Sequence, residues 1–303
     1  MKEEKNLIKA TLKFRKENVR LSWFYSASSI ALLLLFIILT LFVPFLFLKY
    51  VFSFGITIMI VRTFIIYHDY AHGTILRKST LAKILYFIYG IYVLAPINVW
   101  RRTHDYHHRH IGKFFKPSIG SYPLFSKEKF KKSSKKTKIS YLFVRHPITM
   151  LFGYIFTFLF GMCLYPFISN PKKHYDSLIS LIFHSFYILT VYQYFDLQTV
   201  ILVVIIPHFI SSALGAYLFY AQHNFPDAKY KSDKDWTYQH SALESSSYLK
   251  MNKLMEWITG NIGYHHVHHL NPSIPFYRLK EAMTNIKELQ NPKTTTFKIK
   301  DII

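Results

Sequence analysis

The sequence predicts an all-α integral membrane protein with four transmembrane helices, additional in-plane or re-entrant helices, and a cytoplasmic cap that carries three histidine boxes. Three observations predict this fold. Half of the 303 residues are hydrophobic, and the mean hydropathy is positive. From Leu21 to Val61 the only charged residue is Lys49, and this stretch is long enough to cross a bilayer twice. Three clusters of histidines lie at the polar edges of apolar runs.

The first two apolar runs, at about 27–43 and 45–66, are divided by Pro44 and are expected to form two spans. A signal peptide is the alternative for the first run. Its apolar part is too long for one, and a second apolar run follows directly. The charged residues 1–20 are expected to form a cytoplasmic helix that lies at the membrane surface.

Two later runs, at about 178–195 and 198–221, complete the four spans. The run at 81–96 is short for a span, so we place it in the plane of the interface. The run at 148–167 is expected to be re-entrant or in-plane. If it crossed the membrane, three crossings would lie between the second and third histidine clusters and would place them on opposite sides. The lysines of NPKKHYD (170–176) favour the cytoplasmic side. Both termini are then cytoplasmic, and residues 1–303 form a single domain.

The net charge of +22 is concentrated after the second histidine cluster. Residues 101–146 hold thirteen Lys or Arg and only two acidic residues. Such a stretch can indicate nucleic-acid binding, but in a membrane protein it is more typical of a cytoplasmic loop. We therefore expect no nucleic-acid partner and a secondary contact with anionic lipid headgroups. The single cysteine, Cys163, excludes a disulfide framework and a thiolate metal site.

The histidines have the spacing of metal ligands on helices. They lie in HDYAH (68–72), HDYHHRH (104–110) and GYHHVHHLNP (263–272), and residues at i, i+3 and i+4 share one helix face. Eight imidazoles are more than one ion takes, so the spacing predicts two metals. The face-matched residues are His68, His72, His104, His107, His108, His265, His268 and His269. His110 and His266 fall outside this pattern, and His184 and His208, within the spans, are expected to be buried and hydrogen-bonded or to line a polar pocket.

A dinuclear all-histidine site at a membrane surface suits oxygen activation by two redox-active irons, with the bilayer supplying unactivated C–H bonds. Zinc would suit hydrolysis, but no nucleophile motif or carboxylate pair accompanies the histidines. A metal transporter is the alternative from another class. It would place its ligands within the spans, whereas the dense clusters lie outside them.

HDYAH, HDYHH and HHVHH resemble the three histidine boxes (HxxxH, HxxHH and HxxHH) of the membrane-bound fatty-acid desaturases. LFYAQHNF (218–225), SSSYLKM (245–251) and WITGNIGYHHVHHLNPSIPFYRL (257–279) are similar to the Δ12/ω-6 acyl-lipid branch. The resemblance implies that the eight box histidines ligate iron, together with His223 of the FYAQH element. By composition alone His223 is a loop histidine. The stretch 111–125 follows the branch only loosely, and we expect it to help shape the substrate entrance.

The resemblance also implies the reaction. A diiron pair uses O2 as co-substrate to remove two hydrogens from a fatty-acyl lipid, giving a cis double bond and water, with no catalytic residues apart from the metal ligands. The alternative is a related diiron oxygenase: an acyl or sterol hydroxylase, a carotenoid hydroxylase or ketolase, or an alkane monooxygenase. Asp69 and Asp105 are candidates to orient the imidazoles, although either could instead cap a helix or form a surface pair. Asn261, four residues before His265, is a candidate to lie on the same helix face and to hold a metal-bound water.

No GxGxxG, P-loop or HPGG-type haem motif occurs in the sequence. We therefore expect a separate electron donor, a ferredoxin or a cytochrome b5-like protein. Such carriers are usually acidic, and the basic cytoplasmic face would favour their encounter. The lack of a fused donor and of an ER-retention tail favours the bacterial cytoplasmic membrane over the ER.

Overall fold

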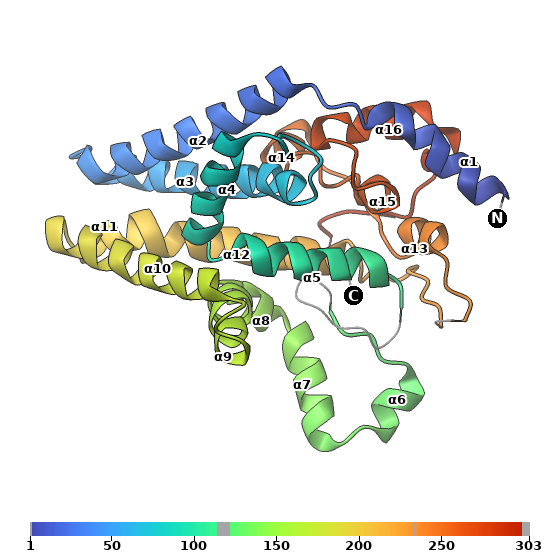
Figure 1. Cartoon of the computed structure of the whole chain (residues 1–303). Helices are drawn as coiled ribbons and strands as arrows, with labels where there is room; N and C mark the ends of the chain where they lie inside the picture. The colour runs from blue at the N-terminus through green and yellow to red at the C-terminus, as the bar shows by residue number, and fades with distance from the viewer. Residues whose placement is uncertain (1, 114–121, 233, 299–303) are drawn as a thin grey trace.

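The computed structural model of the chain describes residues 2–113, 122–232 and 234–298. Long helices form a membrane body, and the N-terminal helix and the C-terminal third form a cap at one end of it (Figure 1). The fold is helical, as the sequence predicts. Of the stretch 111–125 that was expected to shape the substrate entrance, residues 114–121 lie outside the described residues.

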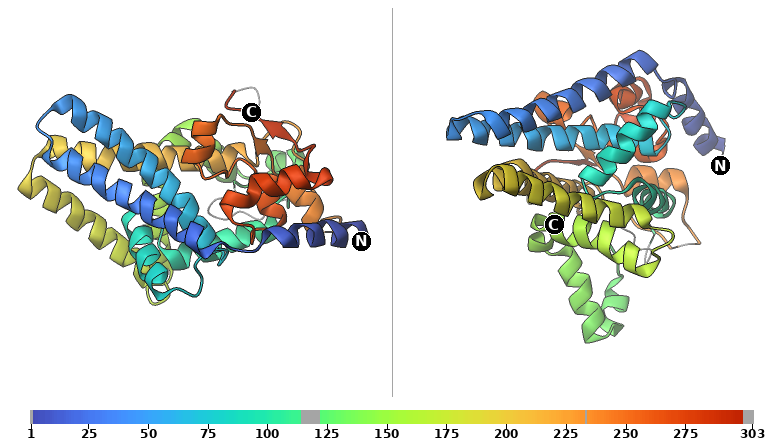
Figure 2. Two further views of the ribbon diagram at one scale, coloured as in Figure 1. Left: turned by 90° about the horizontal axis from the view of Figure 1, so that it is seen from above. Right: turned by 60° about the vertical axis from the view of Figure 1, so that its left-hand side comes forward.

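The first two apolar runs form a hairpin of helices α2 (Val19–Phe42) and α3 (Leu46–Ala71). The Asn18 side chain accepts a hydrogen bond from the Leu21 amide and so begins α2. A Cβ at Gly55 would lie 2.8 Å from the Phe36 ring, so glycine lets the two helices approach closely. The pair forms one layer of the body, and the helices of residues 175–221 form another beside it (Figure 2).

The run predicted to lie in the interface plane forms helix α4 (Thr80–Tyr92), which is followed by α5 (Ile97–His110). The two axes differ by 87°, so together they are either a broken span or a re-entrant element. The corner contains Leu94 with φ of 57° and then Pro96, and proline disfavours helical backbone in the residue before it. The sharp bend turns the second histidine box away from α4.

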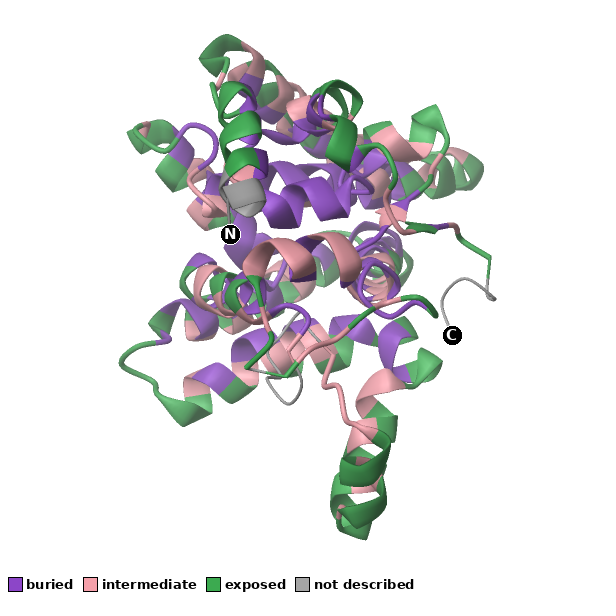
Figure 3. Ribbon diagram, turned by 90° about the vertical axis from the view of Figure 1, so that its right-hand side faces the viewer, coloured by how far each residue is buried: buried purple, intermediate pink, exposed green. Residues whose placement is uncertain are grey.

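An arm of short helices, which we define as residues 122–151, projects from the body. It contains α6 (Lys127–Lys132), α7 (Lys135–Arg145) and α8 (Pro147–Leu151). The arm is mostly exposed, whereas buried residues gather in the middle of the molecule (Figure 3). A π-helix (Tyr154–Leu164) and α9 (Tyr165–Ser169) follow as one apolar helix that is shorter than a span.

Helix α10 (Tyr175–Tyr194) runs back along the body, and a continuous helix then extends from Leu197 to Ala221. This last helix consists of α11 (Leu197–Val200), a π-helical segment (Ile201–Ile205) and α12 (Ile206–Ala221). Among the described residues, three helices are long and apolar enough to cross a membrane: α2, α3 and 197–221. The number rises to four if the bent pair α4–α5 forms one broken span. Helix α10, expected as a span, is not in that set, because polar residues lower its mean hydropathy.

The two histidines within the expected spans are buried and hydrogen-bonded, as predicted. Nε2 of His184 lies 2.5 Å from the Tyr154 hydroxyl. His208 lies on α12, with Nδ1 2.8 Å from the Val204 carbonyl oxygen and Nε2 3.1 Å from that of Tyr92. Both residues therefore join helices within the body.

The cap consists of short helices held by side-chain contacts to the N-terminal segment. The Asn271 amide donates to the Thr11 hydroxyl at 2.8 Å, and the Arg278 guanidinium donates to the Lys13 carbonyl. Among the described residues, a two-residue parallel strand pair departs from the all-α fold. The cap elements are α1 (Lys2–Thr11), α13 (Tyr238–Glu244), β1 (Tyr248–Leu249), α14 (Lys253–Ile258), α15 (His265–Leu270), α16 (Leu279–Asn285) and β2 (Thr294–Thr295).

Candidate metal centre

The three histidine boxes meet where the body joins the cap. The first box lies at the C-terminal end of α3, the second on the last turns of α5, and the third on α15. His223 follows α12 directly and is buried among them. Together these elements place nine imidazoles in two adjacent groups that could each hold a metal ion.

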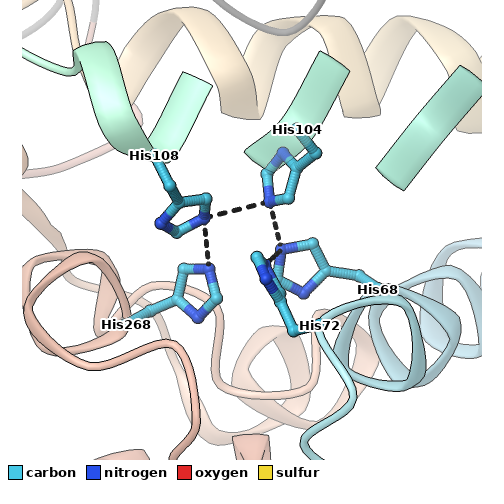
Figure 4. A group of neighbouring side chains, drawn as sticks. All are labelled: His68, His72, His104, His108 and His268. Carbon is cyan, nitrogen blue, oxygen red and sulfur yellow. Dashed lines mark hydrogen bonds between the residues drawn. The ribbon is translucent and has the colours of Figure 1, made fainter. Parts of the chain in front are cut away.

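The first group contains His68, His72, His104, His108 and His268. Figure 4 shows the five imidazoles converging from α3, α5 and the cap. Their Nε2 atoms form a chain of close contacts. The separations are 3.3 Å for His72–His68, 2.7 Å for His68–His104, 3.1 Å for His104–His108 and 3.1 Å for His108–His268.

The second group contains His107, His223, His265 and His269, and its four Nε2 atoms form a closed ring. The sides of the ring measure 3.1 Å from His107 to His223, 2.8 Å from His223 to His265, 3.0 Å from His265 to His269 and 3.3 Å from His269 to His107. The His108 and His269 rings stack with centroids 4.2 Å apart, so the two groups touch.

Helix geometry explains how the boxes divide. In each box the residues at i and i+4 enter the same group: His68 with His72, His104 with His108, and His265 with His269. The residues at i+3, His107 and His268, enter the opposite groups. Successive residues on a helix are about 100° apart, so positions i+3 and i+4 lie on either side of position i. Each three-histidine box therefore contributes to both groups.

The short separations between Nε2 atoms are better explained by a bound cation than by hydrogen bonds between the imidazoles. A neutral imidazole has one N–H and one lone pair, so each Nε2 can take part in one hydrogen bond. Hydrogen bonds can therefore satisfy two of the four contacts in the closed ring, whereas a central cation satisfies all four lone pairs. A metal about 2.1 Å from ligands at right angles sets neighbouring nitrogens about 3 Å apart, close to the separations observed.

Two of the nine imidazoles have an acceptor at Nδ1 that directs Nε2 into the site. His68 Nδ1 lies 3.3 Å from the Asp69 carboxylate, and His223 Nδ1 lies 3.0 Å from the Ser245 carbonyl oxygen. An acceptor there holds the proton on Nδ1 and leaves the Nε2 lone pair free for a metal. The contact with Ser245 therefore identifies His223 as a candidate metal ligand, which its position in the sequence alone did not.

Asp105 and Asn261, the other two residues predicted to lie beside the metal ligands, are placed differently from Asp69. Asp105 is 55% exposed, with an oxygen 4.0 Å from His72 Nδ1, whereas Asp69 is 1% exposed. Asn261 precedes α15, has φ of 59° and donates to the Phe276 carbonyl at 3.3 Å. The helical spacing that was expected to place it on the face of His265 therefore does not apply, since α15 begins at His265.

Burial keeps the imidazoles of the cap neutral at pH 7. It lowers the pKa of His223 from 6.5 to about 4 and holds the pKa values of His265, His268 and His269 well below 6.5. The low-dielectric surroundings disfavour the charged form, and neutral imidazole is the form that ligates metals. His266 lies outside both groups, as predicted, with Nε2 3.3 Å from the Leu289 carbonyl oxygen.

A narrow cavity of about 60 Å³ lies beside the histidines, between α3 and α12. His68, His104 and His265 form one end, and apolar side chains form most of the remaining wall. Along α12 the lining extends from Gln222 back to His208, about 20 Å at 1.5 Å per residue. We refer to it as the metal-side cavity.

Comparisons with known proteins agree with this site. Residues 46–298 match the family described as fatty acid desaturase. The chain is 33% identical over 238 residues to a fatty acid desaturase of Bacillus subtilis, 21% identical to an sn-1 oleoyl-lipid 12-desaturase of Synechocystis, and 26% identical to a chloroplastic sn-2 acyl-lipid omega-3 desaturase (ferredoxin) of Arabidopsis thaliana. These alignments cover 78%, 76% and 72% of this chain and 68%, 65% and 52% of the relatives.

The matches include oleoyl-lipid 12-desaturases, in agreement with the branch that the sequence motifs resemble. Together with two adjacent histidine groups, they favour desaturation over the related hydroxylase, ketolase and monooxygenase reactions. The apolar helices and the matching family indicate a membrane protein. The chain belongs to the fatty acid desaturase family.

Proposed function

We propose that this protein introduces a cis double bond into the acyl chain of a membrane lipid, with O2 as oxidant and two irons held by the nine histidines. The observation that carries the proposal is the closed ring of four Nε2 atoms beside a second group of five, next to an apolar cavity. Bound iron would supply the activation of O2 that removal of hydrogen from an unactivated carbon requires.

In this proposal the residues of the chain orient the iron ligands and exclude water from the reacting carbons. In our proposal Asp69 is a positioning residue, because its buried carboxylate lies against Nδ1 of His68 and so directs that imidazole toward iron. Asp105 has the same part for His72 at longer range. The apolar walls of the metal-side cavity hold the acyl chain close to His68, His104 and His265 and keep bulk water away from the reacting carbons.

We also propose four spans with both termini and the cap on the cytoplasmic side. Helix α10 would be the fourth span, because its outward face is apolar at Ile182, Phe186 and Leu189, each at least 60% exposed. Residues 81–96 and 148–167 would then not cross the membrane. The bend of 87° after α4 and the short apolar helix 154–169 are compatible with that arrangement.

Electrons would come from a separate acidic carrier, a ferredoxin or a cytochrome b5-like protein. The net charge of +22 favours such a partner. The Arabidopsis relative is named for ferredoxin, which supports the first of these donors. A bacterial cytoplasmic membrane remains our proposal for the location.

The test is gas chromatography–mass spectrometry of fatty-acid methyl esters from a host that expresses the chain with a donor. We expect an additional unsaturated ester, absent from cells expressing His268→Ala and present with His266→Ala, since His266 lies outside both groups. Derivatisation locates the double bond. A hydroxylated product, or no new ester from protein that holds iron and receives electrons, would refute the proposal.

A further inference from the structure

A groove of about 1030 Å³ lies between the arm, the π-helix and α12, and it is distinct from the metal-side cavity. It is lined mostly by apolar and aromatic side chains, among them Tyr122, Phe143 and Phe160. Its volume is at the upper end of the roughly 300–1,000 Å³ typical of ligand pockets. The groove is therefore large enough for an acyl chain, yet no histidine of the two groups lines it.

We propose that this groove is the lateral entrance through which the acyl chain of a membrane glycerolipid reaches the metal centre, and that the Phe219 ring is the partition it passes. This inference rests on the desaturase function proposed above and adds its route of substrate entry. A lipid that enters here comes from the bilayer, with its headgroup at the arm.

Phe219 connects the two spaces. It is the residue that lines both the groove and the metal-side cavity among the described residues. On α12, Gly215 faces the metal-side cavity and Ala216 faces the groove. The Phe219 ring lies with its centroid 6.2 Å from that of His104 and 5.7 Å from that of Trp100. It therefore stands between the groove and an imidazole of the first metal group.

The metal-side cavity is too small to hold an acyl chain as it stands, at about 60 Å³. A substrate must therefore displace a wall. Phe219 is only partly buried, and phenylalanine side chains move between staggered rotamers. A rotation of this ring toward the groove would join the two spaces, whereas most other walls of the metal-side cavity are helix faces packed in the body.

The groove carries exposed aromatic side chains. Phe143, Phe156 and Phe160 line it and are also exposed, by 48%, 38% and 51%. A cluster of exposed aromatic residues is expected at a surface that contacts the bilayer and costs free energy in water. The described end of the predicted entrance loop, residues 122–125, contributes Tyr122, Pro123 and Phe125 to the same groove.

The charge at the groove suits a phosphate headgroup. Lys136 is exposed and lines the groove beside Thr137 and Ser140, whose hydroxyls can donate to phosphate oxygens. The segment 127–145 holds eight Lys or Arg against one Glu, so the arm as a whole attracts an anionic membrane surface. The apolar groove and its basic rim therefore match the two ends of one lipid molecule.

The first experiment blocks the groove covalently in the holoenzyme. Thr157 lines the groove and not the metal-side cavity, and the native cysteine, Cys163, is buried with its thiol against the Leu94 carbonyl. A long-chain alkyl methanethiosulfonate should therefore label Thr157→Cys and leave the wild type unlabelled. We expect labelling to reduce desaturation of membrane lipids about tenfold, with iron content unchanged and activity restored by dithiothreitol.

Leu189→Cys is the matched control, because Leu189 is exposed on α10 and lines neither space. Labelled at this position, the enzyme should retain its turnover. Full turnover by stoichiometrically labelled Thr157→Cys would overturn the groove as the entrance. A failure of the proposed function would look different, because the unlabelled wild type would then produce no unsaturated lipid.

The second experiment tests the partition and the headgroup separately. Phe219→Trp should lower kcat/KM about fivefold with iron content unchanged. Phe219→Leu should keep kcat/KM at least at the wild-type value, because the smaller side chain frees the passage. Lys136→Glu should raise KM more for phosphatidylglycerol vesicles than for phosphatidylcholine vesicles, because both lipids carry a phosphate but only the former has a net negative charge. Equal turnover of Phe219→Trp and wild type, or an equal effect of Lys136→Glu on both lipids, would overturn the respective assignment.

Discussion

The Asp69 carboxylate accepts a hydrogen bond from the Phe276 backbone amide at 2.6 Å, across 207 positions of the sequence. Its other oxygen lies 3.3 Å from His68 Nδ1. One buried carboxylate thus connects the end of α3 to the segment that follows the third histidine box. The orientation of His68 in the body and the seating of the cap depend on the same side chain.

Replacement of Asp69 should weaken iron binding. Asp69→Asn keeps one carbonyl oxygen, but its NH2 group must then face either the His68 Nδ1–H or the Phe276 N–H, and both are donors. We expect iron affinity to fall about 10–100-fold, as is usual when a ligand loses the acceptor that orients it. Competition with a chelator measures the change. Asp105→Asn should cause a smaller loss, since Asp105 is exposed and lies 4.0 Å from His72, and an equal loss in both variants would contradict the assignment.

The division of the histidines predicts the iron stoichiometry. His223→Gln removes one member of the four-histidine ring and none of the other group. We therefore expect the purified variant to keep about half of the iron and to lose desaturase activity. His266→Gln should keep all of it, because His266 contacts the Leu289 carbonyl and neither group. Elemental analysis decides, and complete loss of iron from His223→Gln would argue against two separable sites.

The metal-free protein should lose stability in acid. Burial lowers the pKa of His223 to about 4 and the pKa values of the third-box histidines well below 6.5, so the unfolded chain binds more protons between pH 4 and 6.5. Stability of the folded state therefore falls as pH drops below about 6.5, with His223 alone contributing up to about 3 kcal/mol. Chelated protein in detergent should melt at lower temperature at pH 5 than at pH 7.5. In His223→Gln the pH dependence should be weaker, and a melting temperature independent of pH would refute the prediction.

Gly215 offers a test of how deep the substrate reaches. A Cβ at this position would meet nothing closer than the Phe158 ring, 3.9 Å away, so a side chain there enters the metal-side cavity. Gly215→Leu should reduce turnover of long acyl chains about tenfold relative to shorter ones, the equivalent of about 1.4 kcal/mol. Iron content should not change. Product analysis with lipids of graded chain length measures the ratio, and Gly215→Ala should show a smaller shift in the same direction.

Electron delivery should depend on salt. Surface charges attract an acidic donor only within a Debye length, about 8 Å at physiological ionic strength. Turnover with a ferredoxin or cytochrome b5-like donor should therefore fall as salt increases, while reduction by a small neutral reductant should not. Kinetics at graded ionic strength separate the two. An unchanged rate with the protein donor would show that the basic surface plays no part in docking.

Most of the local structure and the identity of the box histidines could be predicted from the sequence. Apolar runs define α2, α3 and the helix 197–221, because hydropathy depends on residues close in the chain. Helix α10 was also predicted as a span. Polar residues within it give it a lower mean hydropathy than the other three helices. The expectation for Asn261 relied on helical spacing, which fails because the chain has positive φ at that residue and enters α15 only at His265.

The sequence by itself determined which imidazoles share a helix face, because the spacing of i, i+3 and i+4 is a property of one helix. Only the tertiary structure decided which of them meet. His107 joins His223 and His265, while its neighbours His104 and His108 join His268. The reason is physical: the positions i+3 and i+4 point to opposite sides of position i, and which side faces which partner depends on how α5, α12 and α15 pack against each other.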